Sequence, residues 1–385
     1  MLKIFILAII LFLGISSVYG QTAKDYLNRG KAEYKQGNYA KAISDYTNVI
    51  KITPNGSEAY ASRGLVYDMQ GDSVQAITDC NKAIELNPNY AEAYANRVLA
   101  YILQWDFTQA ITDSNKAIEL NPNYAEAYAR RGLVYNIEGN LTQAANDYTK
   151  AIELNPKYIK AYNNRGLVYV QQGKNSQASS DYTKAITEFS KAIEINPKDV
   201  ESLNNRGFTY SSQGNLSQAI SDYTKAIEIN PEYALAYLNR GHAYYNQNNT
   251  AQAIIDFTRA IEINPKYAEI YYSRGLAYYK QDILQQAISD YTKTVEINPK
   301  FVDAYYNRGA AYEAQGNLDQ SISDYTKAIE TNPKYVQAYV NRGMAYFSLK
   351  AYDKAWEDVH RIEKLGGKVN PDFISALKDA SGRAQ

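Results

Sequence analysis

The stretch SEAYASRGLVYDMQGDSVQAITDCNKAIELNPNY, residues 57–90, holds the pattern that decides the fold, because close variants of it recur along the chain. Nine of the ten prolines stand at the ends of these variants, with successive gaps of 34, 34, 34, 41, 34, 34, 34 and 34 residues. A fixed spacing of this length is the signature of an array of packed structural repeats. Ten repeats result, and they begin near Ala23, Ser57, Ala91, Ala125, Ile159, Val200, Ala234, Ala268, Val302 and Val336.

Each repeat carries two apolar stripes of helical period, which predict two helices. In residues 57–90 a first helix has Tyr60, Gly64 and Tyr67 on one face. A second helix has Ala76, Cys80, Ala83 and Ile84 on one face. Asn87-Pro88 ends it, because asparagine tolerates the left-handed cap and proline cannot continue a helix. The recurring Arg-Gly pair places a glycine where two helices approach closely, except in the third repeat, which has Arg97-Val98.

The order aromatic, glycine, aromatic, then alanine, aromatic, alanine and proline over 34 residues resembles the tetratricopeptide repeat (TPR) family, and this resemblance covers about nine-tenths of the chain. It implies an all-α fold, a right-handed superhelical α-solenoid of antiparallel helix pairs. The first helix of each pair would line a concave groove. We expect the solenoid to span 21–369 and a capping helix in 370–385, starting at Asn370-Pro371-Asp372, because the last repeat needs a cover for its apolar face.

The single 41-residue gap comes from a duplication inside one helix. Residues 182–188 read YTKAITE, and residues 189–195 read FSKAIEI. Seven residues are close to two helical turns, so the apolar face stays in register and the helix grows by roughly 10 Å.

Residues 1–20 have the features of a secretory signal peptide. Lys3 provides a positive start, Ile4 to Leu13 is apolar, and Val18-Tyr19-Gly20 offers a cleavage site before Gln21. The alternative is an uncleaved membrane anchor, but a spanning helix needs roughly 20 apolar residues. We therefore expect an exported protein, periplasmic or secreted, with no integral membrane segment after cleavage.

Composition argues against several classes of function. Lys+Arg and Asp+Glu are both 41, so the chain lacks the basic excess of a nucleic-acid binder. Cys80 is the only cysteine, and His242 and His360 lie far apart, so no disulfide, metal site or cofactor is expected. A regular array also spreads its polar residues evenly instead of gathering a nucleophile and a base in one pocket. We therefore expect no catalytic residues and no enzymatic activity.

Every repeat carries an arginine in the first helix and an aspartate in the second, as in Arg131 with Asp147. An arginine that points between helices needs a partner, which predicts a ladder of partly buried ion pairs. The alternative is that the aspartate pairs with a lysine three residues on, as Asp222 could with Lys225. Either role is structural.

The TPR resemblance implies that the second, fifth, sixth, ninth, twelfth and thirteenth residues of each repeat face the groove, and we call these the groove positions. At the sixth position asparagine dominates, as in the TPR superhelices whose amides hold the backbone of an extended peptide. This row is Asn28, Asn96, Asn164, Asn205, Asn239, Asn307 and Asn341, with Ser62, Arg130 and Ser273 in the other repeats. The alternative is that these amides only cap or solvate the helix. Only Asn96 and Arg130 match the clamp that other TPR proteins use for a chain-terminal carboxylate, so a clamp is not expected.

Aromatic residues at groove positions provide a second candidate site. They are Phe208, His242, Tyr245, Tyr272, Tyr279, Tyr306 and Phe347. Clustered exposed aromatics mark binding surfaces, although packing between neighbouring repeats is the alternative. We expect Tyr272, Tyr279 and Tyr306 to be partly exposed, and their sequence neighbours Tyr271, Tyr278 and Tyr305 to be buried. Elsewhere the groove is aliphatic, with Leu65, Met69, Leu99, Ile102, Leu103, Leu133 and Ile137.

These observations favour a non-enzymatic scaffold that binds an extended peptide or protein segment in its groove. One alternative is a glycan-binding module whose tyrosines stack on sugar rings. Another is an inert structural spacer.

Overall fold

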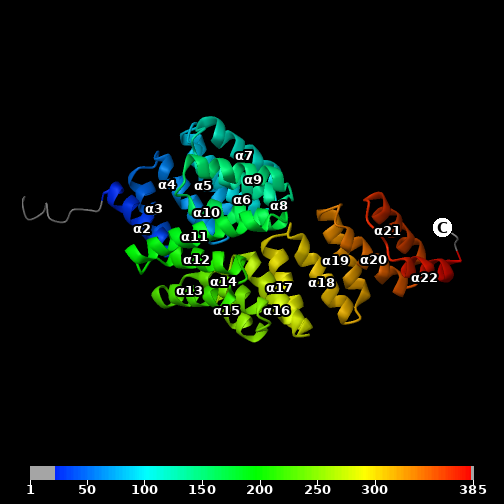
Figure 1. The fold of residues 1–385 in the computed structure, drawn as a ribbon. Coiled ribbons are helices and arrows are strands. Elements are labelled where there is room, and N and C mark those ends of the chain that lie inside the picture. The colour runs from blue at the N-terminus through cyan, green and yellow to red at the C-terminus, as the bar shows by residue number, and fades with distance from the viewer. Residues whose placement is uncertain (1–21, 383–385) are drawn as a thin grey trace, which may run out of the picture. The chain divides into compact units, whose positions relative to one another are not determined.

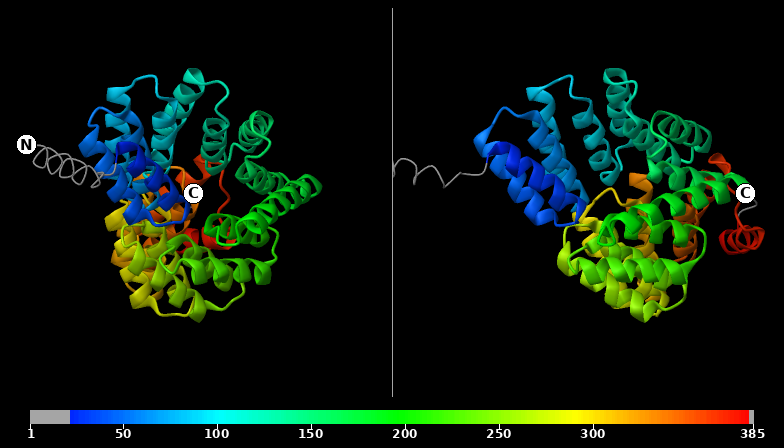
Figure 2. Two further views of the ribbon diagram at one scale, coloured as in Figure 1. Left: turned by 90° about the vertical axis from the view of Figure 1, so that its left-hand side faces the viewer. Right: turned by 60° about the vertical axis from the view of Figure 1, so that its left-hand side comes forward.

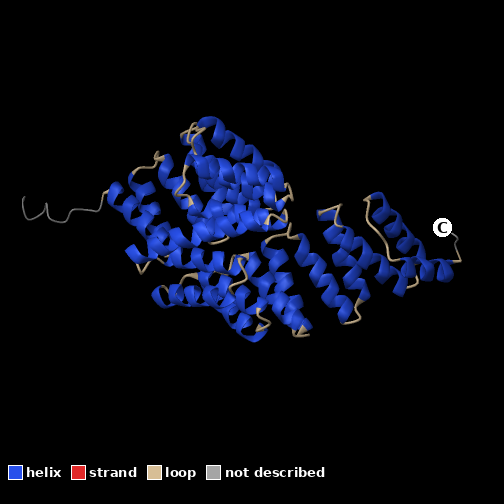
Figure 3. Ribbon diagram, viewed as in Figure 1, coloured by secondary structure: helices blue, strands red, loops and turns tan. Residues whose placement is uncertain are grey.

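The structure is a computed structural model that describes residues 22–382, and the signal-peptide prediction for residues 1–20 lies outside them. The described residues form helices and no strand (Figure 3). The helices are α2 (Ala23–Lys35), α3 (Tyr39–Ile52), α4 (Ser57–Met69), α5 (Ser73–Leu86), α6 (Ala91–Leu103), α7 (Phe107–Leu120), α8 (Ala125–Ile137), α9 (Leu141–Leu154), α10 (Ile159–Gln171), α11 (Asn175–Ile195), α12 (Val200–Ser212), α13 (Leu216–Ile229), α14 (Ala234–Asn246), α15 (Thr250–Ile263), α16 (Ala268–Lys280), α17 (Leu284–Ile297), α18 (Val302–Ala314), α19 (Leu318–Thr331), α20 (Val336–Ser348), α21 (Tyr352–Lys364) and α22 (Pro371–Ser381).

Consecutive helices pair along the chain, as the two-helix repeat predicts (Figures 1 and 2). The even-numbered helices α2 to α20 begin at the ten residues at which the sequence pattern places the repeat starts. Many of the turns inside a pair need a left-handed residue, for which glycine has no steric cost, as at Gly71 with φ 73°. Asp282 takes the corresponding conformation with φ 60°. The all-α TPR solenoid expected from the sequence is confirmed at the level of its paired helices.

The close approach inside a pair explains the recurring glycine. A Cβ built on Gly241 would lie 2.6 Å from Cε1 of Phe257, whose side chain is fully buried. In the third repeat Val98 replaces the glycine, and the small Ser114 replaces the aromatic ring. Both are fully buried. The larger side chain of Val98 is therefore compensated by the smaller side chain of Ser114, which accounts for the departure at Arg97-Val98.

Helix α11 contains the duplicated heptad, and this prediction is confirmed. It has 21 residues, whereas the corresponding helix α9 has 14. Tyr182 and Phe189, which stand at equivalent places in the two heptads, are both buried, with 3% and 5% of their surface exposed. The apolar face therefore continues through the longer helix.

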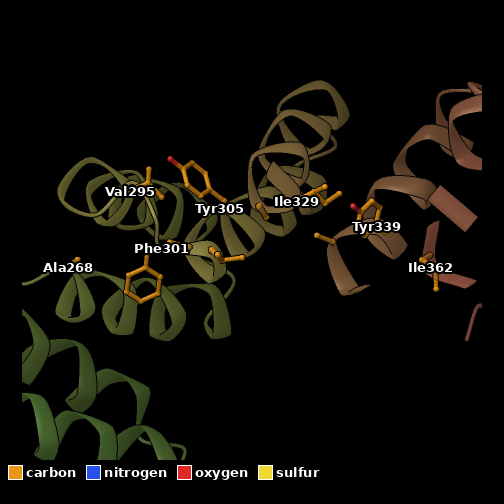
Figure 4. Packing of buried hydrophobic residues seen from close by; sticks show 11 residues of the cluster. Ala268, Val295, Phe301, Tyr305, Ile329, Tyr339 and Ile362 are labelled. Atoms are coloured by element: carbon orange, nitrogen blue, oxygen red, sulfur yellow. The ribbon is translucent and has the colours of Figure 1, made fainter. Parts of the chain in front are cut away.

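The chain divides into two compact units. Unit 1 contains residues up to 101 together with 107–168, and unit 2 contains 102–106 together with residues from 169 onward. In unit 2 a continuous apolar cluster runs from Ala268 in α16 to Ile362 in α21 (Figure 4). None of the helices in the described range combines the length and the apolar composition that crossing a bilayer requires.

The last helix, α22, covers the end of unit 2. The side chain of Asn370 caps it by accepting from the backbone N–H of Asp372 at 2.9 Å. Leu377 is fully buried and packs with Trp356 and Val359 of α21.

Candidate functional site

The Arg–Asp pairs form the predicted ladder. In α4, Arg63 Nε donates to Asp79 Oδ2 at 2.7 Å, and Arg63 Nη2 donates to Asp79 Oδ1 at 2.8 Å. The Asp79 carboxylate raises the pKa of the Arg63 guanidinium, although burial opposes this shift. The ion pairs of this kind are Arg29–Asp45, Arg63–Asp79, Arg97–Asp113, Arg131–Asp147, Arg206–Asp222, Arg240–Asp256, Arg274–Asp290, Arg308–Asp324 and Arg342–Asp358.

From Arg63 onward, the arginines of these pairs also link neighbouring repeats. Arg63 Nη1 donates to Oγ1 of Thr47 in the preceding repeat at 3.0 Å. Arg240 makes the same contact with Thr224 at 3.0 Å. The ladder therefore joins the two helices of one repeat to the second helix of the repeat before it. The arginine and aspartate side chains bind each other within the fold, so their role is structural.

The tyrosines that flank each arginine correct one prediction. Tyr271 and Tyr278 are only partly buried, and Tyr305 alone of the three expected core tyrosines is buried, at 8% exposure. The rings of Tyr271 and Tyr278 flank a guanidinium that is itself partly exposed, and Tyr278 also packs against the buried ring of Tyr291. The Arg274 guanidinium carbon lies 6.0 Å from the ring centre of Tyr271 and 5.8 Å from that of Tyr278.

The asparagine row is partly used by the fold. The Nδ2 groups of Asn239, Asn307 and Asn341 donate across the repeat boundary to Asn204 Oδ1, Tyr272 OH and Tyr306 OH, at 2.9, 2.9 and 3.1 Å. No group in the described part of the chain donates to the three Oδ1 atoms of these amides. Asn28 is exposed, Asn164 and Asn205 are partly buried, and Asn96 is 7% exposed. Asn239, Asn307 and Asn341 can therefore accept from a ligand, although their donors already connect the repeats.

The aromatic groove positions divide into a packed set and an exposed set. Tyr272 lies 4.8 Å from Phe301 and Tyr306 lies 5.3 Å from Tyr335, measured between ring centres. Both tyrosines are partly buried, and burial raises the pKa of each hydroxyl. Two further residues pack against neighbouring segments. His242 Nε2 lies 2.8 Å from Ser273 Oγ, within hydrogen-bond distance, and the ring centre of Phe347 lies 5.7 Å from that of Phe373. Burial also lowers the pKa of His242.

Phe208 and Tyr279 form the exposed set, with 39% and 38% of their surfaces accessible. Tyr245 is intermediate, because Lys280 Nζ lies over its ring at 4.6 Å from the centre. Of the three tyrosines expected to be partly exposed, Tyr279 is thus the most accessible. The two sets could not be distinguished from the sequence. Helical spacing predicts which face of the helix a residue lies on, but it does not predict which side chains of the next repeat cover that face.

No group of three or more His, Cys, Asp or Glu side chains within 22–382 is placed to hold a metal ion. Cys80 is fully buried, and burial raises the pKa of its thiol to about 12, so its thiolate is not formed at neutral pH. One polar group that sequence reasoning passed over is Asp68 at a groove position of α4, which is only 5% exposed.

Comparison with known proteins supports this description. Profiles described as "TPR repeat" match residues 30–71, 132–173, 178–214, 209–248 and 241–282. Profiles described as "Tetratricopeptide repeat" match 57–90, 91–124, 115–145, 159–188, 268–301, 302–335 and 324–357. No curated protein matches the chain.

Among solved structures, the chain is similar to one titled "Crystal structure of MamA". The two share 33% sequence identity over 43% of this chain and 96% of that chain, with a TM-score of 0.39. The profiles show that the chain belongs to the tetratricopeptide repeat family, whose repeats generally serve as scaffolds for protein–protein interaction.

Proposed function

We propose that this protein is a non-enzymatic scaffold that binds an extended polypeptide segment along the groove positions of its first helices. The observation that carries the proposal is the exposure of Phe208 and Tyr279, two large aromatic side chains on the face that also carries the asparagine row. Exposed aromatic anchors usually provide most of the affinity of an interface.

The asparagine row supports a polypeptide ligand. The Oδ1 atoms of Asn239, Asn307 and Asn341 have no donor among the described residues, and an amide oxygen accepts from any peptide N–H without reading the side chain. Aromatic anchors with repeated backbone acceptors suit an extended chain of varied sequence. The same amides are less suited to a rigid folded partner.

The test compares the exposed aromatics with the packed ones. Wild type, the double variant Phe208→Ser/Tyr279→Ser and the control Tyr272→Ser/Tyr306→Ser would each be tested for binding to a random peptide library and for thermal melting. We expect the exposed pair to lose about tenfold or more in peptide affinity with little change in melting. The packed pair should melt earlier, because large buried aromatics contribute a few kcal/mol. Unchanged peptide binding by the exposed pair would contradict the proposal.

A glycan ligand is the second candidate, because the same exposed rings could stack on sugar faces. Retention of the wild type on immobilised polysaccharide, lost in Phe208→Ser/Tyr279→Ser, would favour it over a polypeptide. If no ligand of either kind is retained, the array is a spacer.

We also propose that the protein acts outside the cytoplasm. The support is the sequence of residues 1–20, with Lys3 before a run of ten apolar residues and small residues before Gln21. Fractionation of cells into cytoplasm, envelope and medium would test this proposal directly.

A further inference from the structure

Repeats 2 to 4 depart from the other repeats at positions that meet in space. The aromatic ring of the second helix, present as Tyr148 or Tyr223 elsewhere, is replaced by Cys80 and Ser114. The sixth position of the following repeat fills this region. Asn96 and Arg130 are only 7% and 6% exposed.

The polar groups in this region are connected except for one. Asn96 Nδ2 donates to the backbone oxygen of Ala61 at 3.0 Å, and Arg130 Nη1 donates to Asn96 Oδ1 at 2.8 Å. Arg130 Nη2 also pairs with Glu126. The side chain of Asp68 has no hydrogen-bond or ion-pair partner in the described residues, and its Oδ1 is fully enclosed.

A second acid at the same repeat position shows what Asp68 lacks. Glu313 in α18 accepts from the hydroxyl of Tyr325 at 2.7 Å. In repeat 2 the residue equivalent to Tyr325 is Cys80, which cannot provide that donor. An unpaired buried carboxylate is costly unless a cation or a proton compensates it. Burial raises the pKa of Asp68 to about 7, which Arg130 only partly offsets.

The charges around Asp68 indicate what kind of group could pair with its carboxylate. Arg130 is paired with Glu126, so Asp68 leaves this cluster one positive charge short. Asp68 shares its helix face with Leu65 and Met69, both partly exposed, so accessible aliphatic side chains border the carboxylate on this face. The long apolar stem and charged end of lysine or arginine match these aliphatic side chains and the carboxylate.

We propose that Asp68 anchors a site in unit 1 for a lysine or arginine side chain of the bound polypeptide, with Asn96 and Arg130 beside it. The proposal rests on the proposed peptide-binding function and adds a specificity to it. The ligand cation completes the ion pair that the free protein lacks. Asp68 thus costs stability in the free protein and contributes to affinity in the complex.

The test selects random peptides on the mature full-length protein and on two variants. Asp68→Asn removes the carboxylate, and Glu313→Gln is the matched control, in which the acid is already satisfied by Tyr325. We expect wild type and Glu313→Gln to enrich peptides with lysine or arginine at one fixed position, and Asp68→Asn to lose this preference. A selected lysine peptide should bind wild type about tenfold or more tightly than its norleucine analogue, as a charged hydrogen bond provides. Asp68→Asn should bind both peptides alike.

Selected peptides without a cationic position would overturn this site and leave the peptide-binding function standing. If no peptide is enriched by any of the three proteins, the peptide-binding function fails and the site fails with it. A Glu85→Gln variant controls for general charge, since it removes one exposed acid from α5, the second helix of the same repeat, away from the groove positions. An equal loss of affinity in Glu85→Gln and Asp68→Asn would also overturn the site.

Thermal melting separates a binding role from a structural one. The raised pKa of Asp68 means that the folded protein keeps a proton which the unfolded chain has lost between about pH 4 and about pH 7. Wild type should therefore lose stability as pH rises through this range, and the deficit is complete above it. Asp68→Asn should lose less stability and melt no lower than wild type at about pH 8. A lower melting temperature for Asp68→Asn at that pH would assign Asp68 a structural partner and overturn the site.

Discussion

At the scale of single residues, a guanidinium bonded to an aspartate and flanked by tyrosines is the recurring polar unit of this chain. Arg131 shows the pattern, with Asp147 at 2.8 Å and the ring centres of Tyr128 and Tyr135 at 5.6 and 6.0 Å. The aspartate is 6% exposed. Such a pair need not stabilise more than an apolar pair would, but breaking one side of it leaves the other charge unpaired.

Replacing Asp147 by alanine should therefore destabilise far more than removing a surface charge in the same helix. We expect a loss on the order of 3 kcal/mol for Asp147→Ala. For Lys150→Ala, whose partner Glu153 lies 3.4 Å away on the exposed side, we expect roughly 0.5 kcal/mol or less. Thermal unfolding followed by circular dichroism measures both. Equal melting shifts would show that the ladder contributes no more than surface pairs.

Two glycines of the recurring Arg-Gly pair, Gly241 and Gly343, provide a matched pair of substitutions. A Cβ on Gly241 would lie 2.6 Å from Phe257, whereas on Gly343 the nearest atom is Asp358 Cβ at 3.5 Å. Gly241→Ala should therefore cost about 1–3 kcal/mol through overpacking. Gly343→Ala should be neutral or stabilise by up to about 1 kcal/mol through helix propensity. Urea unfolding of the two variants checks the difference, and a similar loss in both would contradict the packing argument.

At the scale of elements, the sequence predicts the helices well because every repeat carries the same pattern of apolar residues and helix-ending residues. The start of α16 at Ala268 follows from the spacing of prolines and glycines. Tyr272 is partly exposed as expected, but its hydrogen bond from Asn307 of the next repeat could not be predicted in the same way. The unpaired state of Asp68 was not predicted, because it depends on Cys80, which stands where most other repeats have an aromatic ring. Local pattern determines the helices, while contacts across repeats determine the candidate site.

Helix α11 allows a test of register. Deleting residues 183–189 would join Asp181-Tyr182 to Ser190-Lys191 and restore the 34-residue spacing. Seven residues are close to two turns, so the apolar face remains aligned. We expect a folded, cooperatively melting protein in which Arg206 keeps its bond to Ser190, at 3.0 Å in the parent.

Deleting five residues, 183–187, is the control for this experiment. It rotates the end of the helix by roughly 140° and should expose Phe189 and disrupt the following repeats. Circular dichroism and melting would distinguish the two deletions. If both behave alike, register within α11 does not determine folding of this region.

At the scale of the whole molecule, the first helix of the described residues, α2, begins at Ala23, two residues after the expected first residue of the exported protein, Gln21. Thr22 Oγ1 accepts from the backbone N–H of Asp25 at 3.2 Å, and Asp25 Oδ2 accepts from the backbone N–H of Thr22 at 3.0 Å. This capping box satisfies the first free donors of α2. Cleavage before Gln21 would leave this capping box intact, so removal of the signal peptide would not disturb the start of α2.

The last prediction concerns this boundary. Exported protein should begin at or near Gln21, as measured by N-terminal sequencing, and a chain that still contains Lys3 would contradict cleavage. A protein that begins at Gln21 should melt as the exported form does. One that begins at Lys24 loses Thr22 and should be less stable by about 1 kcal/mol within the first repeat, the usual effect of removing a helix cap. Hydrogen exchange in α2 measures that loss locally, because neighbouring repeats in an array can open separately. Equal protection of α2 in the two proteins would show that the cap is dispensable and that cleavage could fall further into the chain without harm.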